Sequence, residues 1–309
     1  MNNYVIQRLA QVVPTIIGVT FFVFLTMSLL PGDPVRIAIE RGMVHATDEQ
    51  IEQQRQRLGL DRPFIVQYGL WMGRVVQGDL GISFHTGRRV RDLVANNIMA
   101  TVELGLVSII FAIVTGVPLG VFSALRRGTW WDTGATIIAV AGVSIPNFWL
   151  GLLLIWFFGL TLGWLPSFGL GTWQHLVLPA VTLGTGSMAI IARLTRSSLV
   201  EILQQDYITT AHAKGLRKRT VAYKHALGNA LIPVVTIIAL SLGTMLSGTI
   251  IVENVFGRPG LGRLAVEGLI DRDYPIVQAT VLVLGLTVVV ANLLADLTYA
   301  VIDPRIRYG

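Results

Sequence analysis

The strongest constraint on this chain is a series of long apolar stretches. Residues 9–30 contain no Asp, Glu, Lys or Arg, and a helix of this length crosses the hydrocarbon core of a bilayer, which is about 30 Å thick. Five further stretches are also long and apolar enough to cross it. We therefore predict an all-α, polytopic integral membrane protein with six transmembrane helices, at residues 9–30, 99–125, 133–158, 176–192, 230–252 and 276–301.

The composition agrees with a membrane protein. Hydrophobic residues make up 53% of the chain and charged residues 14%, whereas about a quarter of a soluble domain is charged. The net charge of +6 comes from basic residues beside the apolar stretches, which favours contact with a lipid bilayer and argues against nucleic acid as a partner. The chain has no cysteine, which excludes disulfide bonds and thiolate metal sites.

The basic residues also predict the orientation. They concentrate in short segments next to the predicted spans, at Arg126 and Arg127 and within residues 193–228. Short loops rich in Lys and Arg stay in the cytoplasm. We therefore predict a multi-pass membrane protein with both termini in the cytoplasm.

The chain divides into two parts. Residues 1–98 contain the first span and a small helical external insertion, and residues 99–309 contain a five-helix core with a cytoplasmic loop at 198–228. Within the insertion we predict a turn at residues 31–34, a short helix at 48–58 and a turn at 78–81. An amphipathic stripe is expected to pack on the spans or the lipid headgroups, with a ligand platform as the alternative; it consists of Phe64, Tyr68, Trp71, Met72, Val75 and Val76.

Several polar residues interrupt the apolar stretches. Glu103 lies about one turn inside the second span, where it is either a paired interfacial acid or a functional one. Pro146 predicts a kink in the third span, and the glycine-rich loop 253–262 predicts a fixed turn that caps the bundle. Small polar side chains either allow tight helix packing or line a path for a polar solute; the candidates for the path are Ser144, Asn147, Ser241, Thr244, Ser247 and Asn292.

The segment 206–233 is the most basic polar run of the chain. Leu203, Tyr207, Ala211 and Gly215 recur every four residues, which places them on one face of a predicted helix. The small side chains on that face would let another backbone approach closely. We interpret the segment as a short helix pressed into a groove of a cytoplasmic partner; the alternative is a charged loop that only sets the topology.

Motifs for chemistry are missing from the sequence. There is no Gly-x-x-x-x-Gly-Lys-Ser/Thr phosphate loop, no His-Glu-x-x-His and no Gly-x-Ser-x-Gly. We predict no catalytic residue, no metal site and no bound ATP, so a separate ATPase must supply the energy for any uphill transport. A membrane enzyme or a self-sufficient channel or carrier is the rival hypothesis.

Ten short motifs in order resemble binding-protein-dependent ABC importer permeases, specifically the first permease subunit of dipeptide and oligopeptide importers. They include Leu30-Pro-Gly-Asp-Pro34, Ser144-Ile-Pro-Asn-Phe-Trp-Leu-Gly151, Phe256-Gly-Arg-Pro-Gly-Leu-Gly262 and Asp303-Pro-Arg305. In addition, Ala211-His-Ala-Lys-Gly215 resembles the coupling loop of these permeases in the bacterial cytoplasmic membrane. The sequence departs from the family at Thr209-Thr210-Ala211, where Glu-Ala-Ala is usual, and at Met99, where proline is common.

The resemblance implies a non-enzymatic permease subunit without a cofactor of its own. Its implied partners are a second, similar permease, two ATPases that bind ATP and Mg²⁺, and an extracytoplasmic solute-binding protein. The implied cargo is a dipeptide or short peptide, with glutathione, nickel chelates and oligosaccharides as alternatives. The loop 198–228 would couple to the ATPase through Asp206, Tyr207, Thr210, Ala211, Lys214 and Gly215.

Overall fold

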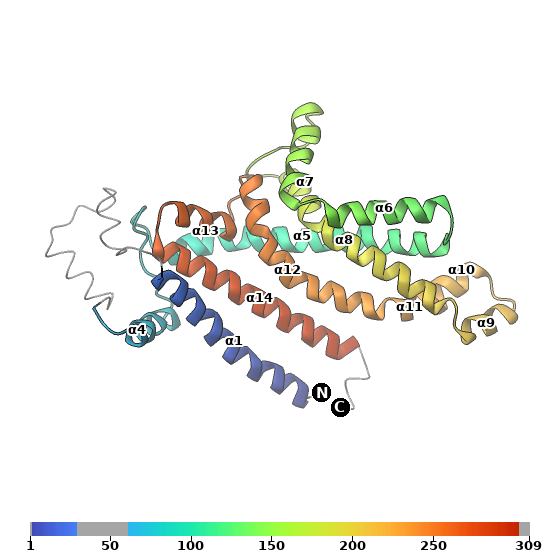
Figure 1. Ribbon diagram of the computed structural model, residues 1–309, viewed down its shortest axis with the longest axis horizontal. Helices are drawn as coiled ribbons and strands as arrows, with labels where there is room; N and C mark the ends of the chain where they lie inside the picture. Colours follow the sequence, from blue (N-terminus) through green and yellow to red (C-terminus); the bar gives the residue numbers. More distant parts are fainter. Residues whose placement is uncertain (1, 30–60, 303–309) are drawn as a thin grey trace.

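A computed structural model of the chain describes residues 2–29 and 61–302 (Figure 1). The predicted turn at 31–34, the helix at 48–58 and the Asp303-Pro-Arg305 motif lie outside these residues. The described residues form helices and no strand, which confirms the all-α prediction. The longer helices are α1 (Asn2–Ser28), α4 (Phe64–Val76), α5 (Val90–Leu125), α6 (Trp130–Ser144), α8 (Gln174–Ile202), α12 (Ile232–Val255), α13 (Leu261–Ile270) and α14 (Tyr274–Ile302).

Short elements connect the long helices. An eight-residue helix α7 (Asn147–Leu154) continues into the π-helical segment η1 (Ile155–Thr161). Between α8 and α12 the chain forms α9 (Asp206–Ala213), α10 (Lys218–Thr220), the π-helical segment η2 (Val221–Ala226) and α11 (Leu227–Ala230).

Five helices are long and apolar enough to cross a membrane: α1, α5, α8, α12 and α14. The pair formed by α6 and α7–η1 gives a sixth span only if it counts as one, because the two halves are bent by 108°. The prediction of six spans is consistent with this arrangement. The helix boundaries differ from the predicted ones. The α5 helix begins nine residues before the predicted span 99–125, and α8 ends ten residues after the predicted span 176–192.

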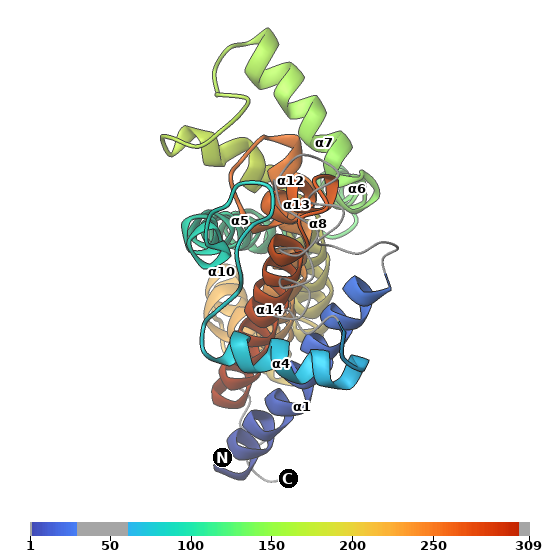
Figure 2. The same cartoon turned by 90° about the vertical axis from the view of Figure 1, so that its left-hand side faces the viewer.

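The bend in the third span is much sharper than the kink that the sequence predicts. Ile145 has extended backbone angles, φ −81° and ψ 122°, as expected for a residue before proline. Pro146 lacks an N–H and cannot continue the helix. The α6 helix therefore ends at Ser144, and α7 leaves the bundle at a steep angle, as Figures 1 and 2 both show.

The core of the bundle is the pair of α5 and α8. Glycines allow their backbones to meet, since a Cβ atom at Gly120 would overlap the carbonyl oxygen of Ala192 and one at Gly116 would lie 2.7 Å from that of Met188. Small residues at helix crossings are the usual means of close packing in membranes. This contact fixes α5 and α8 as the frame on which the other elements are placed.

The amphipathic stripe of α4 packs on the bundle, as predicted, except for Val76, which is 79% exposed. Trp71 is buried together with Val23 and Phe24 of α1 and Leu282 of α14. The hydroxyl of Tyr68 lies 2.9 Å from that of Thr20. Figure 2 shows α4 lying across α1.

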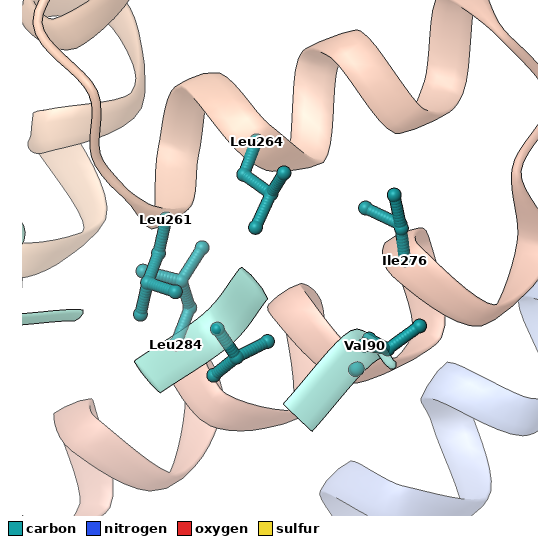
Figure 3. Close-up of a cluster of buried hydrophobic side chains, with 7 residues drawn as sticks. Val90, Leu261, Leu264, Ile276 and Leu284 are labelled. Carbon is teal, nitrogen blue, oxygen red and sulfur yellow. The ribbon is translucent and has the colours of Figure 1, made fainter. Parts of the chain in front are cut away.

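The end of the bundle opposite α9 contains a helix that the sequence analysis missed (Figure 1). After the glycine-rich loop the chain forms α13, which packs between the start of α5 and α14. Figure 3 shows this cluster, in which the labelled side chains are Val90, Leu261, Leu264, Ile276 and Leu284. The loop therefore does cap the bundle, but with a short helix.

Candidate functional site

The candidate coupling segment is α9, which lies at the end of the molecule opposite α13 (Figure 1). Its buried residue is Ile208, whose side chain is only 1% exposed. This side chain packs in an apolar cluster with residues from α5, α8 and the α10–α11 region, namely Val121, Ala124, Leu199, Val221, Ala226 and Ala230. A helix of eight residues is too short to be stable alone, so this contact holds α9 in place.

Both ends of α9 have a local cause. The chain leaves α8 at Leu203 and becomes extended at Gln205, with φ −78° and ψ 151°. At the other end, the N–H of Gly215 donates to the carbonyl of His212 and that of Leu216 to the carbonyl of Ala211. These two bonds form a Schellman motif, which requires the left-handed backbone of Gly215 (φ +81°).

This geometry corrects the predicted helix face. Leu203 belongs to the end of α8 and Gly215 lies beyond the last turn, so neither is on α9. Ala211 is half-buried against the same cluster as Ile208, and Tyr207 is 41% exposed. The four-residue spacing failed because it assumes one unbroken helix. The outward side of α9 and its C-cap instead present Asp206, Tyr207, Thr210 and Lys214.

One hydrogen bond links this exposed side to the next span. The amide of Asn229 in α11 donates to the hydroxyl of Tyr207 over 3.0 Å. Since α11 is followed within two residues by α12, this side-chain contact joins α9 to the region just before a candidate membrane span.

Gly215 gives a testable prediction. We expect Gly215→Ala to reduce ATP-dependent uptake several-fold, because a left-handed residue with a Cβ costs about 1–2 kcal/mol. Gly215→Asn should stay near the wild-type rate, since asparagine tolerates this conformation. The measurement is the initial uptake rate in proteoliposomes, with Gly228→Ala as control because a Cβ there meets open space. Equal rates for all three variants would contradict the capping role. Gly215→Trp is not a clean test of whether Gly215 contacts a partner, because tryptophan would also strain the left-handed backbone at this position.

The candidate path residues do not share one environment. Ser144 and Asn147 flank the break between α6 and α7, Ser144 being exposed and Asn147 half-buried. Ser241 is buried and bonds the carbonyl of Ile237 in its own helix. Asn292 of α14 lies where a Cβ at position 243 would overlap it, so Gly243 serves close packing there.

Thr244 and Ser247 differ from the other candidates. They are exposed on α12 and belong to a stripe with the spacing of one helix face. The stripe consists of Leu240, Thr244, Ser247, Ile251 and Asn254. Three of its five residues, Thr244, Ser247 and Asn254, are polar, which is unusual for a surface that faces only lipid.

The end of the bundle that contains α13 is held by a buried carboxylate that sequence reasoning did not single out. Glu253 is fully buried and accepts hydrogen bonds from the hydroxyl of Thr101 (2.6 Å) and the backbone N–H of Arg263 (3.1 Å). The hydroxyl of Thr101 in turn accepts the N–H of Leu261 (2.8 Å). A Cβ at Gly260 would overlap this carboxylate. The sequence signal that could have pointed to this contact was the pair of glycines, Gly260 and Gly262, that follows Glu253.

Glu103 is a paired acid. The guanidinium of Arg258, which is 1% exposed, donates to its carboxylate over 2.6 Å. This contact ties the glycine-rich loop to α5, as the Glu253 network also does. The two acids of this region therefore hold the cap on the bundle.

A second ion pair closes the opposite end. Arg196 of α8 donates through Nε and a terminal nitrogen to both oxygens of Asp132, at 2.6 and 2.8 Å. Asp132 also accepts the hydroxyl of Ser123 (2.5 Å) and the N–H of Gly128 (3.0 Å). A bidentate pair of this kind is geometrically specific, and it fixes the α5–α6 turn to α8. Among the described residues no group of three His, Cys, Asp or Glu residues could hold a metal ion.

Known proteins resemble the chain over its whole length. The family model "Binding-protein-dependent transport system inner membrane component" matches residues 116–308, and the model of its N-terminal part matches residues 1–105. Glutathione transport system permease protein GsiC of Escherichia coli (strain K12) is 45% identical and that of Pectobacterium atrosepticum 46% identical, each over 308 residues and 100% of both chains.

Solved structures show the same fold. The inward-facing MetNI methionine ABC transporter has a chain with a TM-score of 0.58 and 23% sequence identity, covering 68% of this chain and 96% of that one. An amino acid ABC transporter with histidines gives a TM-score of 0.53 at 15% identity, covering 67% and 93%. From these matches and the membrane-spanning helices, the chain belongs to the family of binding-protein-dependent transport system inner membrane components, the non-catalytic, multi-pass permease subunits of ABC importers.

Proposed function

We propose that this permease subunit imports a short peptide of the size of glutathione, which is a tripeptide. The observation that carries the proposal is the 45–46% identity, over the full length of both chains, to permeases named for glutathione transport. This refines the dipeptide expected from the motifs. Because few charged side chains are buried between the helices, the helices can separate to open a passage without breaking many ion pairs.

The energy enters through α9. We assign the exposed residues Asp206, Tyr207, Thr210 and Lys214 to contact with a separate ATPase, which binds the ATP and Mg²⁺. Ala211 and Gly215 act differently, since they set the position and the end of α9. The basic segment around α9 supports a cytoplasmic location for it and, with it, for both termini. ATPase closure would move α9 and, through Tyr207 and Asn229, the start of α12.

The path for the cargo runs along α12. The exposed hydroxyls of Thr244 and Ser247, flanked on the same helix face by Leu240 and Ile251, suit a surface that is wetted in one state and packed in another. A second, similar permease would supply the opposite wall, and an extracytoplasmic solute-binding protein would deliver the peptide. Ser144 and Asn147 belong to the same proposal because they flank the break between α6 and α7.

The cargo is tested by uptake competition. In cells that lack the chromosomal copy, we expect the complete importer to restore uptake of labelled glutathione at least tenfold over background. Unlabelled glutathione should compete, whereas a dipeptide, a nickel chelate and an oligosaccharide should compete weakly. A variant ATPase without its phosphate-loop lysine is the control for ATP dependence. If glutathione fails to compete and only the dipeptide or only the nickel chelate does, the proposed cargo is contradicted.

A further inference from the structure

A cavity of about 350 Å³ lies between α5, α6 and α8. Along α6 its lining runs from Ala135 to Ser144, which corresponds to about 14 Å. The ion pair of Asp132 with Arg196 lies one helical turn before this stretch of α6. The cavity is therefore an elongated slot along the helices.

Most of the wall of this slot is apolar. The apolar side chains are Leu119 of α5, Ala135, Ala139, Val140 and Val143 of α6, and Ala189 and Ala192 of α8. The α8 side also contains two arginines, Arg193 and Arg196. A slot with a long apolar wall and a cationic mouth has the polarity of an amphiphile with an anionic head.

The two arginines are not equivalent. Arg196 is neutralised by the bidentate pair with Asp132. Arg193 is exposed and makes no hydrogen bond or ion pair with the described part of the chain. It is also the first charge after the uncharged residues 176–192, so it lies at the boundary of the apolar layer. An unpaired guanidinium at that depth is costly, and a phosphodiester would satisfy it with two parallel hydrogen bonds.

Aromatic side chains mark the same boundary. Trp130 and Trp131 begin α6 and are 91% and 63% exposed. Trp131 lies one helical turn before Ala135 of the slot, and the guanidinium of Arg126 stacks 5.5 Å from its ring. Exposed tryptophans gather at the headgroup level of a bilayer, and cationic pockets between spans at the cytoplasmic side hold anionic lipids.

We infer that the slot between α5, α6 and α8 binds one anionic phospholipid, with an acyl chain along Val140 and Val143 and the phosphate on Arg193. The site rests on the orientation proposed above, in which this end of the bundle faces the cytoplasm. The lipid would brace α6 against α8, next to the turn that Asp132 holds. A transmembrane helix of another subunit is the competing occupant, but an apolar helix would leave the charge of Arg193 unpaired.

The test measures lipid retention by the purified importer. The complex is equilibrated in mixed micelles with equal phosphatidylglycerol and phosphatidylcholine, and the lipid bound per complex is determined by native mass spectrometry. We expect phosphatidylglycerol to be retained over phosphatidylcholine by about tenfold, as for one charge-assisted contact. Arg193→Gln should abolish this preference and Arg193→Lys should keep part of it. Val140→Trp should reduce retention of both lipids by filling the slot, and it is tolerated because Val140 is exposed.

Arg89→Gln is the matched control, since it removes an exposed arginine from the other end of α5. Excess inorganic phosphate should leave the bound phosphatidylglycerol in place, because the acyl chain contributes to binding. Equal retention of the two lipids by the wild type, or wild-type preference in Arg193→Gln, would overturn the inference. So would efficient cross-linking of Val140→Cys, the single cysteine of the chain, to the second permease. These outcomes leave the cargo proposal standing, because cargo is measured by uptake.

Discussion

Replacing Ile208 with Asp should lower ATP-dependent import to background while the protein still inserts in the membrane. The side chain is 1% exposed and is the buried anchor of an eight-residue helix. A carboxylate in that apolar cluster is strongly unfavourable without a partner, so α9 would detach. Ile208→Ala should give a graded loss of at least about tenfold, because truncating a buried isoleucine costs roughly 2–5 kcal/mol and 1.4 kcal/mol is a factor of ten.

The measurement is the initial rate of peptide uptake by the complete importer in proteoliposomes, together with the amount of subunit recovered. Thr209→Ala is the matched control, since Thr209 is the exposed neighbour of Ile208 on the same helix. Limited proteolysis after Arg217 should become faster in the Ile208 variants and not in the control. Normal import by Ile208→Asp, at normal protein levels, would show that α9 does not need this anchor and that the coupling assignment is wrong.

Gly262→Ala should destabilise the cap of the bundle that α13 and the glycine-rich loop 253–262 form. A Cβ at this position would overlap the Cα of Ile250 and lie 3.0 Å from a carboxylate oxygen of Glu253. The α13 helix would have to move, and the buried carboxylate would lose the N–H of Arg263. An unsatisfied buried polar group costs about 1–3 kcal/mol, more when charged. Gly260→Ala should act in the same direction because its Cβ would overlap that carboxylate.

Thermal unfolding of the purified subunit in detergent tests this prediction. We expect the midpoint to fall by about 5 °C or more, at roughly 2–4 °C per kcal/mol for a chain of this size class. Gly69→Ala in α4 is the control, because a Cβ there meets open space and alanine favours a helix over glycine by about 1 kcal/mol. The control should leave the midpoint unchanged or raise it. A Gly262→Ala midpoint equal to that of the control would refute the role of the Glu253 network.

Features that depend on neighbouring residues in the chain were predictable. Uncharged apolar runs located the spans because the cost of burying charge in lipid depends on local composition. The stripe of α4 was found from its helical period, and glycines at positions 78 and 81 do have positive φ. The family resemblance was also a property of short ordered motifs, and the full-length matches confirm it.

Features that depend on distant contacts were not predictable. The sequence indicated a helix near 206–215, but which side of α9 is buried follows from the cluster that surrounds Ile208, drawn from α5, α8 and η2. Proline predicted a kink, whereas the structure shows a bend of 108° between α6 and α7, an angle that Pro146 by itself does not specify. Glu253 looked like a loop acid until Thr101, from a helix 152 residues away, was found beside it.

The sequence by itself thus determined a six-span, all-α permease with a basic segment outside the membrane, because hydropathy, charge and turn residues act over one or two helical turns. Only the tertiary structure decided which side chains anchor α9, which acids hold the cap formed by α13 and where a slot opens beside Arg193. Those features arise where helices from separate parts of the chain meet, and no local pattern records which faces will be brought together.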